Sequence, residues 1–476
     1  MNLQRRSKIV CTLGPATESE AMIARLIEAG ADVIRLNFSH GDYEGHGKAI
    51  ERIRRIAGRH GKAVAILQDL QGSKIRIGVL KEPVYRLKKG DSFTLFGTSV
   101  AGDCDGASTN HNSLYKRVSP GNLILLNDGQ IVLCVRKISG KDIICRVIEG
   151  GMLSPHKGVN VPGQELGVSA LTRKDWNDLQ FGLDHGVDFV ALSIVKSAKE
   201  ILAVKKFIKK VGTSTAEGTT TAVIAKLELA VAILNLDEII KAADGVMVAR
   251  GDLGVDLPPE QVPLLQKEII RRANSAQIPV ITATQMLESM ITQTRPTRAE
   301  ASDVANAVLD GTDALMLSGE TATGTYPIEA VQMMDRIILA AERQQQVTDT
   351  RITTGLSVSE AVSKAACLLA REMNATAIVT STLSGAAALR LSKYRPQVSI
   401  IAFTLSEEIK RRMSLYWGVL AHSISKQLTG EDIFKEMIRE VRRENLAKKG
   451  DLLVLVSQSP KVETIPTDLI KVYQMP

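Results

Sequence analysis

Two charged residues, Lys226 and Glu228, lie inside the otherwise aliphatic stretch VIAKLELAVAI at residues 223–233. Side chains on a β-strand alternate between two faces, so a strand here places Lys226 and Glu228 on the same face. Burying an isolated charge is costly. The pair is therefore either a mutually satisfied ion pair or part of a site that binds a charged ligand.

A second carboxylate, Asp252, follows the apolar run of VMVARGDLGVD at residues 246–256. If these two stretches are neighbouring strands, Glu228 and Asp252 close them about 4.8 Å apart and can share one divalent ion. Magnesium suits this arrangement, because it takes one or two protein carboxylates and completes its shell with water and substrate oxygens. Backbone amides near Gly251 and Asp252 suit a carboxylate or phosphate. The alternative is a capping aspartate beside a Lys226–Glu228 ion pair, but the clustering of charges favours a site.

Further polar residues have types that suit phosphoryl chemistry. Arg35 in RLNFS and Arg76 in SKIRIG offer guanidinium groups that can clamp a phosphoryl group. Thr284 and Ser318 are short hydroxyls that could orient a water molecule or relay a proton. A single hydroxyl at the end of a strand is more often structural, so the hypothesis depends on the other charged and polar residues that lie near these two.

Short apolar runs that are each followed by a helix-like segment position these residues. The runs lie at residues 8–14, 32–39, 63–70, 188–195, 222–228, 245–252, 279–285 and 314–320. Apolar strands that alternate with helices indicate a parallel sheet covered on both faces, and about eight such units are typical of a (β/α)₈ TIM barrel. The polar residues near the ends of these runs are Arg35, Asn37, Ser39, Asp69, Ser193, Lys226, Glu228, Arg250, Asp252, Thr282, Thr284, Ser318 and Glu320. Barrel enzymes build their active sites at that rim.

Other segments predict two further domains in this α/β protein. We expect the catalytic barrel at residues 1–70 and 169–345, interrupted at residues 71–168 by an inserted all-β lid domain that forms a β-barrel. The insert leaves from a loop on the active-site side, where a lid would exclude water. Residues 346–476 contain five more apolar runs with helices between them, which predicts an open α/β domain with a regulatory role.

Length and composition limit the class of protein. A chain of 476 residues predicts roughly three domains. The net charge of +8 is spread along the sequence and aromatic residues make up 4%, so anionic metabolites are favoured over nucleic acid as partners. The five cysteines are scattered, which predicts reduced thiols without a zinc site. No signal-peptide pattern or membrane-length apolar run is apparent, so we expect a cytoplasmic protein without membrane contact.

Long motifs resemble those of pyruvate kinase, of the bacterial type, over essentially the whole chain. These motifs are KIVCTLGPAT, GADVIRLNFSHG, DLQG, LLNDGQI, KGVNVPG, ALTRKD, VMVARGDLGV, ITATQMLESMI with RPTRAE, and DVANAVLDGTDALMLSGETATGTYP. The resemblance implies transfer of the phosphoryl group of phosphoenolpyruvate to ADP, which gives pyruvate and ATP in the final step of glycolysis. Two rival hypotheses are another metal-dependent barrel enzyme of enolates, such as an aldolase or lyase, and a catalytically silent binding protein. The motif blocks and the intact charged set disfavour both.

The resemblance also implies roles for individual residues. Glu228 and Asp252 match the ligands of Mg²⁺ or Mn²⁺, and Lys226 matches the lysine that neutralises the moving phosphoryl group. The remaining matches are catalytic Thr284, Arg35, Arg76, Ser318 and Glu320; substrate-binding Arg35, Lys226, Gly251, Asp252 and Thr284; and nucleotide-binding Arg76, Lys157, Asn37 and His40, with Asp128 facing the nucleotide from the lid.

A potassium requirement is not expected. Many relatives hold this ion with residues that match Asn37, Ser39 and Asp69 and with the backbone carbonyl at Leu70. Potassium-dependent members also tend to carry threonine and glutamate at the positions of Leu70 and Lys74. A lysine ammonium is a tethered monovalent cation, so Lys74 can supply the missing charge.

A regulatory site is expected in the last domain. Thr382, Ser384 and Gly385 lie between a predicted strand and a predicted helix, a suitable place for an anion, and relatives bind sugar-phosphate effectors at the equivalent turn. The alternative is an ordinary capped turn. Family resemblance also implies a homotetramer.

Overall fold

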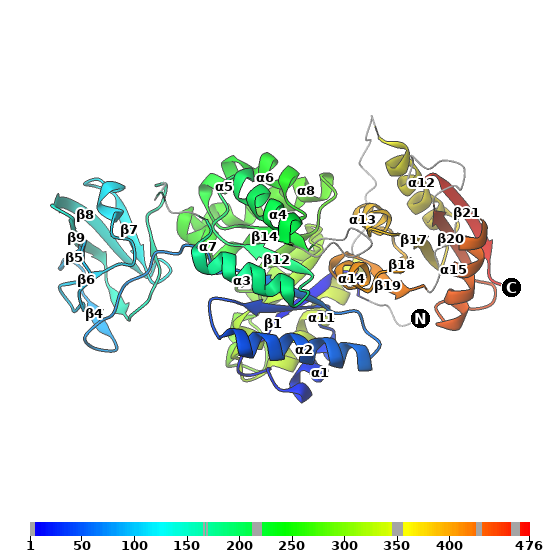
Figure 1. The fold of residues 1–476 in the computed structure, drawn as a ribbon, viewed down its shortest axis with the longest axis horizontal. Helices are drawn as coiled ribbons and strands as arrows, with labels where there is room; N and C mark the ends of the chain where they lie inside the picture. Colours follow the sequence, from blue (N-terminus) through cyan, green and yellow to red (C-terminus); the bar gives the residue numbers. More distant parts are fainter. Residues whose placement is uncertain are drawn as a thin grey trace.

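The computed structural model describes residues 5–164, 167, 170–211, 221–344, 356–424, 431–457 and 467–476. Figure 1 shows three lobes in a row, with an inserted lobe of strands at one end, a barrel in the middle and an α/β lobe at the other end. The predicted domain boundaries at 168/169 and 345/346 include residues outside this description. Within the described residues, no helix combines the length and the apolar composition that crossing a membrane requires.

The central lobe is the predicted eight-stranded parallel barrel. Its strands close in the order β1-β16-β15-β14-β13-β12-β3-β2. Their bounds are β1 Lys8–Thr12, β2 Val33–Asn37, β3 Ala65–Asp69, β12 Phe189–Leu192, β13 Ala222–Leu227, β14 Gly245–Ala249, β15 Val280–Ala283 and β16 Ala314–Leu317. All eight predicted runs are therefore confirmed as barrel strands.

Helices surround the barrel and begin at recognisable caps. Their bounds are α1 Glu20–Ala29, α2 Tyr43–Arg59, α3 Arg173–Asp184, α4 Ala198–Val211, α5 Ala230–Leu234, α6 Leu236–Ala242, α7 Arg250–Asp256, α8 Val262–Ser275, α9 Arg298–Leu309, α10 Gly319–Ala322 and α11 Pro327–Gln344, with 3₁₀ turns η2 Pro259–Gln261 and η3 Glu288–Ile291. Helix α9 starts with a capping box in which Thr297 and Glu300 satisfy backbone N–H groups that the first turn leaves free. Helix α1 ends at Gly30, whose φ of 118° lies in the left-handed region that glycine tolerates.

Several predicted runs extend past the ends of their strands, and two of these overruns lie in short helices. The run at residues 245–252 is a strand only to Ala249, and Asp252 lies in the first turn of α7 rather than at the end of a strand. The run at residues 314–320 stops at Leu317, so that Ser318 precedes α10 and Glu320 lies inside it. In both places a short helix begins directly after the strand or one residue later.

The inserted lobe contains short strands, most of them paired antiparallel, as expected. Its elements are β4 Tyr85–Leu87, β5 Ser92–Phe96, β6 Gly106–Ser108, β7 Leu123–Leu126, β8 Ile131–Ser139, β9 Asp142–Glu149, β10 Gly151–Leu153 and β11 Val159–Asn160, with the 3₁₀ turn η1 Leu114–Lys116. In the described residues, hydrogen bonds join them into a six-stranded sheet, β11-β7-β8-β9-β5-β6, and a separate pair, β10-β4. Residues 76 and 77 bridge the two edges of this sheet, because Arg76 pairs with Gly158 beside β11 and Ile77 pairs with Thr109 beside β6.

The last lobe is the predicted open α/β fold. Its sheet has the order β19-β18-β17-β20-β21, and β21 is antiparallel to β20. The elements are α12 Val358–Glu372, β17 Ala377–Ser381, α13 Ala386–Lys393, β18 Ser399–Thr404, α14 Glu407–Arg412, η4 Met413–Leu415, β19 Val419–Ser423, α15 Glu431–Arg443, β20 Leu452–Ser457 and β21 Leu469–Gln474.

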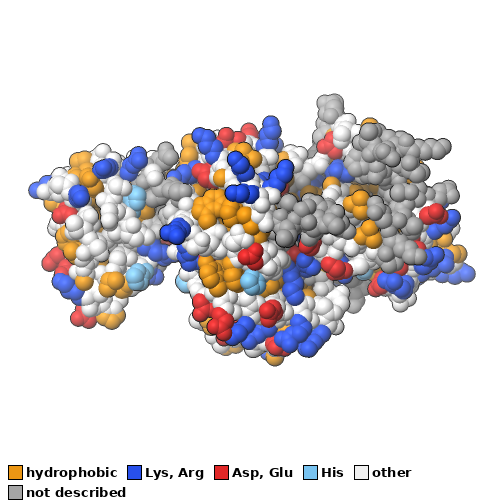
Figure 2. All heavy atoms as spheres, in the orientation of Figure 1, with side chains coloured by type: hydrophobic (Ala, Val, Ile, Leu, Met, Phe, Trp, Pro, Cys, Tyr) orange, Lys and Arg blue, Asp and Glu red, His pale blue; other side chains and the backbone are white. Residues whose placement is uncertain are grey.

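Basic side chains are not gathered into a single patch on the described face drawn in Figure 2. Figure 2 shows Lys and Arg side chains spread over the described parts of all three lobes and interspersed with Asp and Glu on this face. This pattern agrees with the expectation that the net charge of +8 belongs to a solvated surface.

One apolar cluster connects the barrel interior with the last lobe. It includes inward-facing strand residues such as Val10 and Met247 together with Ile378 and Val456 of the last sheet. A separate cluster fills the layer between the barrel strands and their helices. At the junction, Lys8 is buried and its ammonium donates to the carbonyl oxygen of Val419 at 2.8 Å. The two lobes therefore share a core instead of only touching.

Four aspartates repeat the same contact around the bottom of the barrel. Each directly precedes an alternate strand, and its carboxylate accepts the backbone N–H of the neighbouring earlier strand. The pairs are Asp32 with Ile9 at 2.8 Å, Asp188 with Ile66 at 2.7 Å, Asp244 with Val223 at 2.9 Å and Asp313 with Val280 at 2.8 Å. Each repeat therefore ties two adjacent strands at their N-terminal ends.

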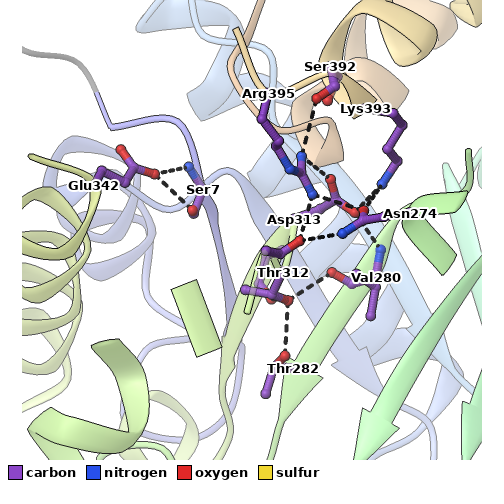
Figure 3. A network of polar contacts seen from close by, with 12 residues as sticks. Ser7, Asn274, Val280, Thr282, Thr312, Asp313, Glu342, Ser392, Lys393 and Arg395 are labelled. Atoms are coloured by element: carbon purple, nitrogen blue, oxygen red, sulfur yellow. Dashed lines mark hydrogen bonds and ion pairs between the residues drawn. The ribbon is translucent and has the colours of Figure 1, made fainter. Parts of the chain in front are cut away.

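Two of these aspartates also hold the last lobe. Asp188 pairs with Arg411 at 2.8 Å, and buried Asp313 pairs with Lys393 and with Arg395, the latter at 2.8 Å (Figure 3). Burial raises the pKa of Asp313, but Arg395 and Lys393 more than compensate, so this pKa lies below its ordinary value. The carboxylate of Asp313 is thus ionised and joins the barrel strands to the last lobe.

We expect Asp313→Asn to lower the free energy of unfolding by about 3–5 kcal/mol, because two buried cations lose their counter-charge. The carboxylate of the parent has a lowered pKa, so its stabilisation is present above the pKa of an unfolded aspartate and is lost as pH falls through the folded value. Urea unfolding at neutral and acidic pH measures both effects.

Asp244→Asn is the matched control. Its amide can still accept the N–H of Val223, and its ion pair with Lys205 is one-third exposed, so the lost pair should cost only about 0–1 kcal/mol. Equal losses in the two variants would contradict the interpretation of Asp313.

Candidate active site at the mouth of the barrel

Asp69 is the centre of a polar layer that closes the apolar barrel interior. Its buried carboxylate pairs with the Arg35 guanidinium at 2.7 Å and with the Lys226 ammonium at 3.1 Å. Arg35 also donates to the hydroxyl of Thr12 at 3.0 Å. Burial raises the pKa of Asp69, but Lys226 and Arg35 outweigh this effect, so the pKa lies below its ordinary value. Side chains from β1, β2, β3 and β13 thereby meet inside the mouth.

Lys226 and Glu228 do leave the same face of β13, as the sequence predicts. The Lys226 ammonium lies 2.9 Å from Glu228 Oε1 and donates to the hydroxyl of Ser193 at 2.7 Å. Burial lowers the pKa of Lys226, but Asp69 and Glu228 more than compensate, so the pKa lies above its ordinary value. Lys226 is therefore a permanent cation at the end of the barrel.

Glu228 keeps one oxygen available. Its Oε2 accepts the backbone N–H of Ile194 at 3.2 Å. Its Oε1 is buried and, among the described residues, accepts no hydrogen bond of ordinary geometry, although the Lys226 ammonium is near. The Ile194 backbone has a φ of 59°, which is strained for a β-branched residue. A buried carboxylate oxygen that faces a cation and accepts no hydrogen bond of ordinary geometry suits a metal ion.

Asp252 is held beside Thr284 by the start of α7. The Thr284 hydroxyl accepts the N–H of Gly251 at 2.8 Å and donates to the carbonyl of Ala283 at 2.6 Å. Thr284 itself has a φ of 70°, which is uncommon for threonine. The structure therefore brings together Gly251, Asp252 and Thr284, which were expected to share a substrate site. The Asp252 carboxylate pairs with the Lys74 ammonium at 2.7 Å.

A cleft of about 520 Å³ separates the barrel mouth from the inserted lobe. The expected metal ligands Glu228 and Asp252 line its barrel side. The expected lid residues Asp128 and Lys157 also line it, together with Lys74 and Arg76. Arg76 was expected on the same rim as Arg35, but its guanidinium donates to the His156 carbonyl at 2.9 Å inside the insert.

The other expected site residues have mainly local contacts. Asn37 accepts the N–H of Ser39 at 3.1 Å, and His40 is exposed. Glu320 is buried and accepts the backbone N–H groups of Leu287 at 3.0 Å and Ser318 at 2.7 Å, and its burial raises its pKa. These contacts give Glu320 a structural task, because they fix the turns that follow β15 and β16.

The expected cation region divides into two parts. Asp69 is balanced by Arg35 and Lys226, whereas Lys74 reaches Asp252 instead. The carbonyl of buried Leu70 accepts the Ser193 hydroxyl at 2.8 Å. In the last lobe, Thr382 caps the backbone N–H of Gly385 at 3.0 Å, and Ser384 is exposed.

Two contributors were not assigned to the site from the sequence. Ser193 accepts from Lys226, and Ile194 donates to Glu228. The sequence carried a signal for Ser193, since it is a polar residue at the end of a predicted strand. The sequence carried no signal for Ile194, because this residue contributes its backbone N–H, whose direction depends on a left-handed backbone conformation.

Comparisons with known proteins match the whole chain. A family model described as the barrel domain of pyruvate kinase matches residues 4–331, and one described as the alpha/beta domain of pyruvate kinase matches residues 360–473. The chain is 42% identical to a pyruvate kinase of Geobacillus stearothermophilus over 477 residues, which cover 99% of this chain and 80% of that protein. It is 41% identical to a pyruvate kinase of Mycobacterium tuberculosis over 473 residues, which cover 99% of each. It is also similar to the crystal structure of a pyruvate kinase from Cryptosporidium parvum, with a TM-score of 0.92, 35% identity and coverage of 99% and 96% of the two chains.

Proposed function

The chain belongs to the pyruvate kinase family, and we propose that it transfers the phosphoryl group of phosphoenolpyruvate to ADP, giving pyruvate and ATP in the last step of glycolysis. One observation carries the chemistry: Lys226 is a permanently charged ammonium held at the end of the barrel by Asp69, Ser193 and Glu228. Phosphoryl transfer depends mainly on positioning and on electrostatic stabilisation. A cation fixed before the reaction needs little reorganisation when charge develops.

Members of this family use a divalent metal ion, and we propose that Glu228 and Asp252 hold Mg²⁺ or Mn²⁺ here. The buried Oε1 of Glu228 supports this assignment, because among the described residues it accepts no hydrogen bond of ordinary geometry and its charged neighbour at 2.9 Å is the Lys226 ammonium. Such an ion, when bound, supplies positive charge to the phosphoryl and enolate oxygens. The carboxylates fix the position, and Lys226 adds charge from the barrel side.

The remaining roles are assigned to residues around the cleft. We propose that Arg35 supports the substrate phosphate from the barrel and that Thr284, held against Gly251, orients the proton delivered to the enolate carbon. Ser318 and Glu320 support this proton path through the turns that they fix. Arg76, Lys157, Asn37 and His40 are assigned to the nucleotide side. We also propose a cytoplasmic location. We propose a homotetramer as the oligomeric state, which light scattering would test.

We expect Lys226→Met to lose about 3 kcal/mol of transition-state stabilisation, on the order of a hundredfold to a thousandfold in rate, because methionine keeps the length and removes the charge. A coupled assay for pyruvate from phosphoenolpyruvate and ADP measures the loss. Lys48→Met on the exposed face of α2 is the control and should leave the rate unchanged. Turnover near that of the parent would refute the role of Lys226.

We propose that this enzyme does not require potassium. The mouth holds three carboxylates, Asp69, Glu228 and Asp252, and three cations, Arg35, Lys226 and Lys74, so the formal charges of this set sum to zero (3 − 3 = 0). Burial lowers the pKa of Lys74, but Glu228 and Asp252 outweigh it and the pKa is raised. Lys74 is thus a stable cation, and each of the three carboxylates in this set has a cationic partner.

We expect the parent rate to change by less than about twofold when potassium is replaced by a large organic cation at constant ionic strength. Leu70→Thr combined with Lys74→Glu should create a potassium requirement, because the same set of residues then carries a net charge of −2 (two cations and four carboxylates). Initial rates of both proteins provide the measurement. A strong potassium dependence of the unmodified protein would contradict the proposal.

We also propose a sugar-phosphate effector at the turn formed by Thr382, Ser384 and Gly385. Gly385 has a φ of 83° and starts α13 with its N–H capped by Thr382, while Ser384 is exposed beside the same helix end. Backbone N–H groups at a helix N-terminus favour a phosphate. The shared core between this lobe and the barrel supports a route for the coupling.

A phosphorylated sugar is expected to lower the half-saturating concentration of phosphoenolpyruvate, and Ser384→Asp should abolish this shift by like-charge repulsion. Ser384→Asn adds a similar volume without charge and should retain much of the response. Steady-state kinetics at increasing effector concentrations compare the three proteins. Equal activation of parent and Ser384→Asp would place the effector elsewhere.

A further inference from the structure

Each proposed metal ligand already has a lysine ammonium beside it. Lys226 lies 2.9 Å from Glu228, and Lys74 lies 2.7 Å from Asp252. The two lysines approach from different parts of the fold, Lys226 from β13 of the barrel and Lys74 from the segment that leads from β3 into the insert. The carboxylates therefore have cationic partners before any metal ion binds.

The two lysines differ in how firmly they are held. The Lys226 side chain is 10% exposed and has Asp69 and Ser193 as further acceptors. The Lys74 side chain is 28% exposed, and Asp252 is the only side chain that its ammonium contacts among the described residues. Lys74 can therefore leave its carboxylate at lower cost than Lys226 can.

We propose that Lys74 is the resident counter-cation of the metal site, competing with the divalent ion for Asp252 until an anionic ligand in the cleft draws its ammonium away. This inference rests on the proposed metal site. A divalent ion on Asp252 would lie within several ångströms of the Lys74 ammonium, where like charges repel strongly in a partly desolvated cleft. Metal and anion should consequently bind together better than either binds alone.

The cleft beside Lys74 offers a second position for its ammonium, next to an anion bound between the two lobes. Arg76 and Lys157 line the same cleft and make that side suitable for a phosphate. The Lys74 backbone is fixed, since its carbonyl accepts from Asn110 at 3.1 Å and the next-but-one residue, Arg76, donates its N–H to the same side chain at 2.8 Å. Only the flexible stem of Lys74 needs to move, from the metal ligand toward an anion between the two lobes.

Binding of Mn²⁺ to the full-length protein without substrates, measured by electron paramagnetic resonance, tests this inference. We expect Lys74→Met to bind Mn²⁺ about fivefold to tenfold more tightly than the parent, since one repelling charge is gone. Lys74→Arg keeps the charge and should retain the weak binding. Inorganic phosphate should tighten Mn²⁺ binding to the parent and have little effect on Lys74→Met. Lys74→Gln is a second neutral variant in case methionine disturbs folding.

Matched controls separate this inference from the proposed function. Lys157→Met removes a cation from the same cleft that contacts neither carboxylate in the described structure and should change Mn²⁺ affinity by less than about twofold. Asp252→Asn should weaken Mn²⁺ binding; if it does not, the metal site itself is wrong. If Asp252→Asn weakens binding while both neutral Lys74 variants bind Mn²⁺ as the parent does or more weakly, the competition is refuted and the metal site stands.

Discussion

The buried carboxylate of Asp69 is the constraint on which the candidate active site depends. It faces two cations from two different strands, and without it Arg35 and Lys226 would be buried like charges at the end of an apolar barrel. Because it is ionised and has a partner for each oxygen, it fixes both cations in one geometry. The Lys226 side chain is then held in a conformation that contacts both Glu228 and Ser193. The positions of the remaining polar groups at the mouth follow from this one pairing.

The barrel uses aspartates at both ends, for different purposes. At the bottom, Asp32, Asp188, Asp244 and Asp313 each join two adjacent strands, and the cations that balance them are structural. At the mouth, Asp69 has no backbone donor of this kind in the described structure and instead orients cations toward the cleft. An apolar interior separates the two charged layers. The same residue type therefore supplies rigidity at one end and a preorganised field at the other.

The barrel could be predicted from sequence because each strand carries its own local signal, an apolar run followed by polar residues. Features that depend on distant contacts could not. Residues 250–256 contain Gly251 and Gly254, which are weak helix formers, and the start of α7 is fixed by the hydroxyl of Thr284, which directly follows β15. Lys74 and Asp252 are 178 residues apart, so no local pattern predicts their pairing. The sheet of the insert, in which β5 and β6 are parallel and Arg76 and Ile77 bridge the two edges, likewise follows from tertiary pairing.

The core shared by the barrel and the last lobe affects how the chain can acquire its structure during synthesis. Strand β1 is among the first segments made, yet it pairs with β16, and Lys8 at its start reaches a carbonyl 411 residues later. Domains usually fold in order from the N-terminus as they emerge from the ribosome. Here the end of the barrel that packs against the last lobe stays exposed until nearly the whole polypeptide has been released. The nascent chain must therefore carry this apolar surface for most of its translation.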